Sequence, residues 1–399
     1  MTLAGCGGSG SSQPSGQTPA FKKLTIAVVA PFSRDAYLGT TIANGVRLGG
    51  GRLTFPVGRD YFQFKVVQYD SAGSPSQAVA AVRRALAAKA VAIVTDGTGV
   101  DASWRLANRA KVPIGIVYDG AETLVDPVER PNVFRIAPTN HGLAFRLAEY
   151  LVPKGLKVAI LTDDTGYGRA GRASLDHAFS QNESSVAIRV QIPSTATDLA
   201  PQILKARRAG ATALLIWAEP GAIAEAVIGT RASGWKVPIY APPAAEDPLV
   251  RQELASHPEW MDGLTFASGR MTAEKGPAPF LRFQALYNQT FGPQEVGVKS
   301  ARGRAVIQPP DYAMYPYDFV RLLASAIHAA GVLDPAAILN AMDEVSVEGA
   351  NGDARGFNQS NHESVIDDDV YFARFDGMVF RPVKDDALSA TLPSIQQEQ

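Results

Sequence analysis

From residue 22 onward, short apolar runs alternate with longer segments of helical pattern. The runs Leu24–Ala30 (LTIAVVA) and Lys157–Thr162 (KVAILT) are rich in apolar residues, and stretches such as Ser76–Ala88 and Gly168–Phe179 separate such runs. Short apolar runs spaced by helices of about 10–15 residues favour parallel βαβ units, whose right-handed crossovers produce doubly wound sheets. The pattern therefore predicts an α/β fold.

The alternation runs through two series, and a more varied final third follows them. The first series predicts strands at 24–30, 62–69, 90–95, 112–117 and 134–136, and the second at 157–162, 185–192, 213–218 and 238–241. Afterwards come a strand at 264–267, helices at 280–291, 314–330 and 335–342, and a hairpin around Asp376-Gly377. We expect these later pieces to complete two sheets, so that the chain crosses between two lobes several times.

The composition excludes several classes of function. The 399 residues include 38 Lys plus Arg and 39 Asp plus Glu, and the formal net charge of −1 gives no positive field for nucleic acid. A single cysteine excludes an intrachain disulfide and a zinc site built on several cysteines, and the five histidines form no paired motif. We therefore expect no nucleic-acid partner, no metal and no cofactor.

Motifs typical of enzymes are absent from the sequence. The chain has no GxSxG elbow, no Walker A loop and no HExxH pair. Three acidic residues in expected loops, Asp96, Asp163 and Asp164, leave a catalytic cluster open as an alternative, although ordinary loop polarity explains them more simply. We expect a protein that is not an enzyme.

The N-terminal segment differs from the rest of the chain. Residues 1–20 carry no charged side chain and are rich in Gly, Ser, Pro and Gln, so we interpret 1–21 as a flexible tether. Within it, Leu3-Ala4-Gly5-Cys6 resembles a bacterial lipobox, and Cys6 is the only cysteine. This predicts a lipid on Cys6 that anchors an extracytoplasmic protein to a membrane. An ordinary exposed cysteine is the alternative.

Several local motifs occur in a characteristic order along the body of the chain. They are Pro31-Phe32-Ser33 with Tyr37-Leu38-Gly39, Tyr69-Asp70-Ser71-Ala72-Gly73-Ser74-Pro75, Val112-Pro113, Asp163 with Tyr167-Gly168, and Tyr317-Asp318-Phe319-Val320. In this order and spacing the chain resembles type I periplasmic solute-binding proteins of the branched-chain amino acid-binding family, over about residues 22–385.

The resemblance implies two α/β lobes joined by a three-stranded hinge, with a small solute, an amino acid or a related carboxylate, held in the cleft between them. Lobe one would comprise 22–138 plus 268–344, lobe two 139–267 plus 345–385, and 386–399 would be a C-terminal tail. The resemblance also implies a lipoprotein that delivers its solute to the permease of an ABC importer, and we expect a monomer. A sensor that docks on a membrane partner is an alternative, because receptor ectodomains share this fold.

Candidate ligand contacts lie in loops after the predicted strands. Ligands of doubly wound sheets bind outside the carboxyl ends of the strands, where helix N-termini present free N–H groups. In the Gly97-Thr98-Gly99 loop the resemblance implies a ligand carboxylate, and Tyr167 matches an aromatic residue that closes over the ligand. The full set of candidates is Ser33, Arg34, Tyr37, Gly97, Thr98, Gly99, Tyr118, Asp119, Gly120, Tyr167, Glu219 and Tyr312.

One departure from the family leaves the solute open. Amino acid binders carry an acidic residue that pairs with the ligand ammonium, but the aligned residues here are Pro242-Pro243-Ala244. Because a buried ammonium needs a paired charge, either Glu246, Glu219 or Asp119 replaces that acid or the ligand is not an α-amino acid. Arg34 would then pair with an aromatic or organic carboxylate.

Overall fold

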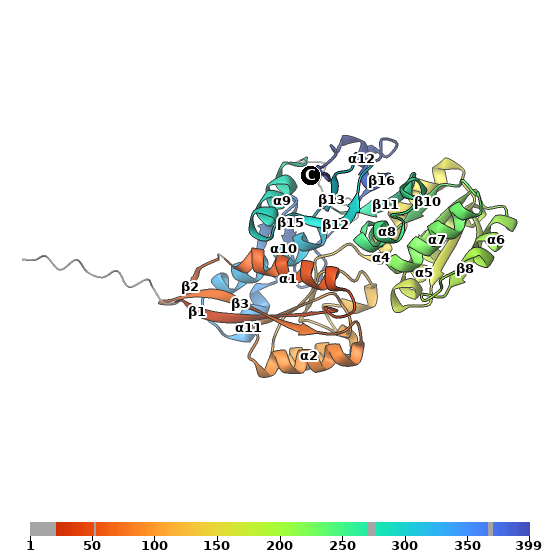
Figure 1. Cartoon of the computed structure of the whole chain (residues 1–399). Helices are drawn as coiled ribbons and strands as arrows, with labels where there is room; N and C mark the ends of the chain where they lie inside the picture. The colour runs from red at the N-terminus through yellow and green to blue at the C-terminus, as the bar shows by residue number, and fades with distance from the viewer. Residues whose placement is uncertain (1–20, 52, 270–275, 366–369) are drawn as a thin grey trace, which may run out of the picture.

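A computed structural model describes residues 21–399 except 52, 270–275 and 366–369. The chain forms two α/β lobes that lie side by side, and Figure 1 shows α1 and α2 in one lobe and α5, α6 and α7 in the other. The expected pair of doubly wound lobes is therefore confirmed. The predicted lipid site at Cys6 lies outside the described residues.

The sheet of lobe one has the strand order β2-β3-β1-β4-β5-β6, and only β2 is antiparallel to its neighbour. The second half of β1 has five consecutive buried residues, as expected for a strand covered by helices on both faces. The strand bounds are β1 (Lys22–Ala30), β2 (Phe55–Val57), β3 (Asp60–Asp70), β4 (Ala92–Thr95), β5 (Ile114–Ile116) and β6 (Val133–Arg135).

The sheet of lobe two has the order β17-β16-β11-β10-β9-β7-β8. The strands of the second predicted series and β11 are parallel, whereas β16 and β17 form the predicted hairpin at Asp376-Gly377 and add an antiparallel edge. The bounds are β7 (Val158–Asp163), β8 (Val186–Ile192), β9 (Ala213–Trp217), β10 (Ile239–Ala241), β11 (Leu264–Ser268), β16 (Tyr371–Asp376) and β17 (Val379–Pro382).

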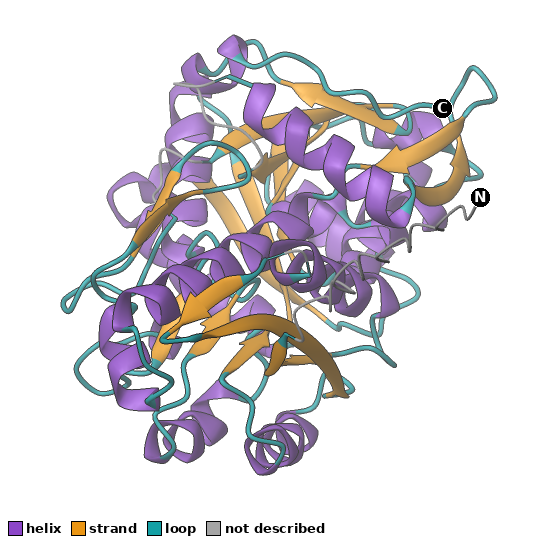
Figure 2. Ribbon diagram, turned by 90° about the vertical axis from the view of Figure 1, so that its left-hand side faces the viewer, coloured by secondary structure: helices purple, strands orange, loops and turns teal. Residues whose placement is uncertain are grey.

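Helices cover both faces of each sheet (Figure 2). Those of the first series are α1 (Ala36–Gly50), α2 (Pro75–Ala87) and α3 (Val100–Arg109). Those of the second are α4 (Asn140–Leu151), α5 (Gly166–Ala178), α6 (Ala200–Arg208), α7 (Pro220–Ala232) and α8 (Pro248–Glu253). The last are α9 (Ala278–Phe291), α10 (Asp311–Ala330), α11 (Pro335–Ala341) and α12 (Ala387–Thr391).

The boundary between the lobes in the final third differs from the expected one. We assigned residues 345–385 to lobe two, but β14 (Ser346–Glu348) and β15 (Ala354–Gly356) lie against α10, which packs on α1 of lobe one. The fully buried Arg135 of β6 needs an acidic partner, and Glu363 supplies it. Residues 346–365 therefore belong with lobe one, and the chain enters lobe two only after them.

The C-terminal residues also differ from a simple tail. A hairpin, β12 (Gln294–Lys299) and β13 (Ala305–Gln308), projects between α9 and α10 and lies against α8 of lobe two. The last residues of the chain pair with β13, because Ile307 N–H donates to the carbonyl oxygen of Gln397 at 2.9 Å. Ile395 and Leu392 are buried, so residues 386–399 form part of the packed structure.

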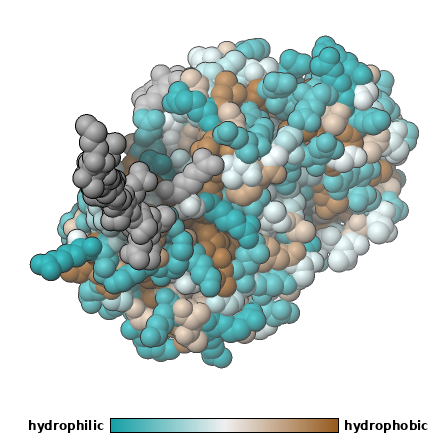
Figure 3. All heavy atoms as spheres, turned by 60° about the vertical axis from the view of Figure 1, so that its left-hand side comes forward, coloured by the Kyte–Doolittle hydropathy of each residue, from teal (hydrophilic) through white to brown (hydrophobic). Residues whose placement is uncertain are grey.

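The outer surface has few large apolar side chains, and on the face in Figure 3 hydrophobic residues form small patches among hydrophilic ones. Within the described part of the chain, no single helix is long and apolar enough to cross a membrane. Only α10 and α11 taken together reach that length and composition, and they meet at 116°.

Candidate functional site

A cavity of about 530 Å³ lies at the carboxyl ends of strands from both sheets, and we name it the cleft cavity. Lobe one and lobe two both contribute to its wall, and its volume is within the range of small-molecule sites. Eight of the residues predicted from sequence line it, namely Arg34, Gly97, Thr98, Gly99, Tyr118, Asp119, Tyr167 and Glu219.

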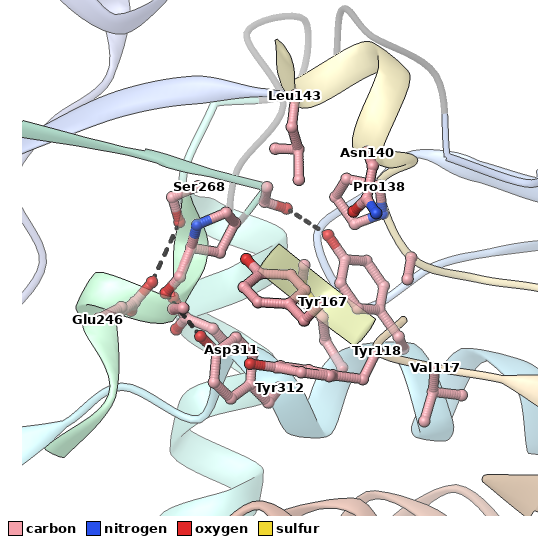
Figure 4. A pocket seen from close by; sticks show the side chains of 16 residues that line it. Val117, Tyr118, Pro138, Asn140, Leu143, Tyr167, Glu246, Ser268, Asp311 and Tyr312 are labelled. Carbon is pink, nitrogen blue, oxygen red and sulfur yellow. Dashed lines mark hydrogen bonds between the residues drawn. The ribbon is translucent and has the colours of Figure 1, made fainter. Parts of the chain in front are cut away.

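A second, smaller cavity of about 50 Å³ lies next to it at the passages between the lobes, and we name it the hinge cavity. Tyr118 and Tyr167 line both cavities, and Figure 4 shows them close to Tyr312, another predicted site residue. The remaining polar wall of the hinge cavity is formed by Asn140, Glu246, Ser268 and Asp311. The structure thus brings together nine of the twelve predicted residues around two adjoining cavities.

Three predicted residues lie outside the described lining of both cavities: Ser33, Tyr37 and Gly120. The N–H of Ser33 donates to Asp70 Oδ1 at 3.2 Å, and the Ser33 side chain lowers the pKa of Asp70. A Cβ at Gly120 would lie 2.6 Å from the carbonyl oxygen of Pro138, so this glycine permits close packing of two loops. Ser33 and Gly120 therefore do not line either cavity but take part in the packing of loops next to them.

The loop after β4 holds its hydroxyl groups against a carboxylate of the protein. Thr98 Oγ1 donates to Asp96 Oδ2 at 2.6 Å, and Thr95 Oγ1 donates to Asp96 Oδ1 at 3.1 Å. Gly97 N–H donates to Thr95 Oγ1 at 3.2 Å. The expected role of Thr98 as a donor to a ligand carboxylate is therefore already taken by Asp96.

A second carboxylate, that of Asp119, packs against the same loop. Gly97 has a φ of +122°, and a Cβ at this position would lie 2.4 Å from the Cβ of Asp119, so only glycine fits here. Burial raises the pKa of Asp96 to about 6, and the negative charge of Asp119 contributes to that rise. Burial likewise raises the pKa of Asp119.

In lobe two, Asp163 positions Tyr167 and Glu219, the two predicted residues that line the cleft cavity from that lobe. It is buried at the end of β7 and accepts from the side chain of Thr165, the N-cap of α5, at 2.5 Å. Its second oxygen accepts from the N–H of Glu219 at 2.7 Å. Asp163 thereby fixes the start of α5, which carries Tyr167, and the start of α7, which carries Glu219. The alternative of a catalytic role for Asp163 has no support in these contacts.

Glu219 faces charges from the other lobe. Burial raises the pKa of its carboxyl group, and the guanidinium of Arg34 in lobe one opposes that rise. Arg34 itself is exposed and donates to the carbonyl oxygen of Gly73 at 3.4 Å. The two lobes are therefore near enough across the cleft cavity for their charges to interact.

Tyrosines form the floor between the cavities. The rings of Tyr118 and Tyr312 meet edge to face with centroids 5.3 Å apart, and Tyr37 meets Tyr312 at 6.1 Å. Tyr312 Oη donates to the carbonyl oxygen of Pro243 at 2.7 Å and so joins α10 of lobe one to lobe two. Burial raises the pKa of all three phenols and of Tyr167 well above the ordinary value, so the four remain neutral.

Glu246, one of the acids considered as a substitute for the missing ammonium partner, lies at the wall of the hinge cavity (Figure 4). It is almost fully buried, and Ser268 Oγ donates to its Oε2 at 3.4 Å. Asp119 and Glu219 lie instead at the larger cleft cavity.

Sequence reasoning missed several lining residues. Asp35 and Arg169 face the cleft cavity, and Asn140 lines the hinge cavity with an Nδ2 that has no hydrogen-bond partner. Asp35 and Asn140 stand at helix starts after predicted strands, which is the signal that could have identified them. Among the described residues, no group of three or more His, Cys, Asp or Glu side chains is arranged to hold a metal ion.

Comparisons with solved structures identify similar folds. A type 1 periplasmic binding protein from Bordetella pertussis Tohama I shares 20% identity at a TM-score of 0.77, over 90% of this chain and 99% of that one. The leucine binding protein LivK from Thermotoga maritima shares 19% at a TM-score of 0.74, over 90% and 97%. A solute binding protein from Rhodopseudomonas palustris BisB5, in complex with 3,4-dihydroxy benzoic acid, shares 19% at 0.72, over 90% and 95%. A search of curated proteins gave no match.

The family comparison covers most of the sequence. The model of the periplasmic binding protein family matches residues 23–378, which include every residue of the cleft cavity and all of the lobe-two sheet except its edge strand β17. The chain therefore belongs to the periplasmic binding protein family, as its sequence motifs predicted.

Proposed function

We propose that this protein captures a small solute outside the cytoplasm and delivers it to the permease of an ABC importer. The observation that carries the proposal is the cleft cavity of about 530 Å³, whose wall comes from the loops of both lobes. Membership of the periplasmic binding protein family supports it. Capture involves no making or breaking of bonds, so we propose no enzymatic activity.

A cavity lined by both lobes supports hinge closure as the mechanism of capture. A solute in the cleft cavity contacts Thr98 and Asp119 in lobe one and Tyr167 and Glu219 in lobe two only when the lobes are close. The solute therefore binds the closed form more tightly and shifts the population towards it. The permease would then recognise the closed form.

The test combines a binding screen with small-angle X-ray scattering. A panel of amino acids, amines and organic acids is screened by thermal shift, since a solute at 100 times its dissociation constant stabilises by about 2.7 kcal/mol. We expect at least one hit, and a smaller radius of gyration at saturation with that solute. A hit that leaves the radius of gyration unchanged would contradict closure.

Solutes that carry an ammonium group fit the site better than simple organic acids. Structures similar to this one hold isoleucine in one case and 3,4-dihydroxy benzoic acid in another. The cleft cavity of this protein is lined by Asp35, Asp96, Asp119 and Glu219 and by the cations Arg34 and Arg169, while Asp101 pairs with Arg130. Arg135, behind the lining, also attracts Asp119, but it is itself paired with Glu363. An ammonium group would be compensated by this wall, whereas an acid without one would not.

We also propose that a lipid on Cys6 anchors the protein to the membrane, with the segment up to residue 21 as its tether. The test is expression in a bacterial host fed an alkyne-labelled fatty acid. Label and membrane fractionation are expected for the parent chain, preceded by a signal peptide, and both should be lost in Cys6→Ala. Label that persists in the variant would contradict the assignment.

A further inference from the structure

The cleft cavity has an acidic wall on lobe one, at the position where a ligand carboxylate was expected. Asp96 precedes Gly97 in the chain, and the Asp119 side chain packs against Gly97. A solute carboxylate placed at this loop would meet two carboxylates in a partly buried setting. Like charges at such short range are strongly unfavourable where water is excluded.

Several hydrogen-bond donors at and behind this wall are directed to groups of the protein itself. The Thr98 hydroxyl donates to Asp96, and the N–H of Ala121 donates to Asp119 Oδ1 at 2.9 Å. Gly97 N–H is directed to Thr95 Oγ1. The Thr98 hydroxyl and the Ala121 N–H are thus taken by carboxylates of the protein, and the remaining lone pairs of these carboxylates can accept hydrogen bonds from a solute.

The opposite wall, on lobe two, is also suited to a cation. Glu219 is held in place through its backbone by Asp163, and its carboxylate lines the same cavity as Asp119. The rings of Tyr118 and Tyr167 line the cavity between the lobes, and both phenols stay neutral. Aromatic faces attract ammonium groups, and more so where water is excluded. The tyrosine rings are a feature independent of the carboxylates, and they favour the same class of ligand.

The positive groups of the cavity are more exposed than the acidic ones. Arg34 is exposed and contacts the carbonyl oxygen of Gly73, and Arg169 donates to the carbonyl oxygen of Asp164 at 2.5 Å. A carboxylate on the solute, where there is one, would therefore point towards Arg34 and Arg169, while the ammonium would point towards the Gly97 loop.

We propose that the solute is a small aliphatic amine with a net positive charge, whose ammonium group lies between Asp119 of lobe one and Glu219 of lobe two. The alkyl chain lies along Tyr118 and Tyr167. This orientation places the cation where the family resemblance implied a carboxylate. The inference rests on the proposed function, since it names the solute class for the same cavity.

The test is isothermal titration calorimetry with 1,4-diaminobutane and L-lysine as cationic probes, and L-isoleucine and 4-hydroxybenzoate as probes without net positive charge. Asp119→Asn and Glu219→Gln keep the shape of each side chain and remove its charge. We expect at least one cationic probe to bind and the other two to bind at least about tenfold more weakly. Each variant should weaken the cationic probe by about tenfold or more. Glu129→Gln removes an exposed carboxylate, paired with Arg105 outside both cavities, and should change nothing.

The outcomes separate the solute class from the function. Absence of binding by both cationic probes overturns the inference, and a response to isoleucine or 4-hydroxybenzoate alone does so while leaving solute capture intact. Binding of a cation that is equal in both variants and the parent would overturn its placement between the lobes. Melting curves of the variants confirm that they fold. If no solute in the wider thermal-shift screen binds, the proposed function itself fails.

Discussion

At the scale of single residues, the buried carboxylate of Asp96 makes stability depend on pH. Its pKa in the folded chain is about 6, above the ordinary value of 3.8, because burial disfavours the charged form. Between these two values the folded chain binds more protons than the unfolded chain, so this group makes the free energy of unfolding fall as pH rises from about 4 to about 6. Asp318 and Asp247, with pKa values raised to about 6 and about 7, act in the same direction.

Asp96→Asn removes one of these contributions while keeping an acceptor for Thr95. As pH rises from about 4 to 7.5, we expect the free energy of unfolding to fall less in the variant than in the parent. The difference between the two decreases is on the order of 1–3 kcal/mol. Urea unfolding at a series of pH values measures it. Asp60→Asn, at an exposed carboxylate paired with Lys22, is the control and should follow the parent. A variant with the full pH dependence of the parent would show that Asp96 stays charged.

The same loop marks the limit of prediction for individual residues. Thr98 and its flanking glycines were correctly placed at the cavity, because a β–α turn at the carboxyl end of a strand follows from local pattern. The partner of the Thr98 hydroxyl could not be predicted: this hydroxyl donates a hydrogen bond to Asp96, and Asp119 approaches from the loop after β5. Contacts of this kind depend on side-chain orientation and on strand neighbours, which a single sequence does not specify.

At the scale of elements, the packing of α1 on α10 depends on a glycine. A Cβ at Gly45 would lie 2.3 Å from the carbonyl oxygen of Ala313 and 2.6 Å from Pro316 Cγ. Backbone atoms cannot move aside as a flexible side chain can, so Gly45→Ala must separate the two helices. We expect a loss of about 1–3 kcal/mol in the free energy of unfolding, measured in urea.

A matched substitution tests whether this loss comes from the helix contact. Gly221 lies in α7, and a Cβ there would meet only Leu249 Cδ2 at 3.9 Å. Gly221→Ala should be neutral or stabilise by about 0.5–1 kcal/mol, because alanine favours the helix. Equal losses in both variants would argue against the close contact between α1 and α10.

Elements that are buried on both faces could be predicted, and exposed or short ones could not. The strands of the two series and their helices were predicted within a few residues, since continuous apolar runs such as β1 and β9 leave little ambiguity. The hairpin β12–β13 and the pair β14–β15 were missed. The residues of β12, β14 and β15 are largely half-buried or exposed, and all four strands are only three to six residues long, so no strong alternation of apolar and polar residues marks them.

At the scale of the whole molecule, the hairpin β12–β13 and the C-terminal residues join the two lobes on one side of the cleft. Gln252 Nε2 of α8 donates to the carbonyl oxygen of Val296 at 2.7 Å, while α10, which follows the hairpin, packs on α1. Gln397 completes the link from lobe two. Its Nε2 donates to the carbonyl oxygen of Phe380 in β17 at 2.6 Å, and its own carbonyl oxygen accepts from Ile307 of β13.

This link should restrict how far the lobes separate. Gln397→Ala removes two side-chain hydrogen bonds to β17 from a buried position, one donated and one accepted. We expect a larger radius of gyration for the solute-free protein by small-angle scattering. A weaker apparent affinity for the solute should accompany it, because a smaller fraction of the molecules is then competent to close. The neighbouring Gln396 is exposed and bonds only locally to Glu398, so Gln396→Ala should match the parent in both measurements. If Gln397→Ala lowers the melting temperature but leaves the radius of gyration and the affinity as in the parent, the link stabilises the fold without limiting the opening of the cleft.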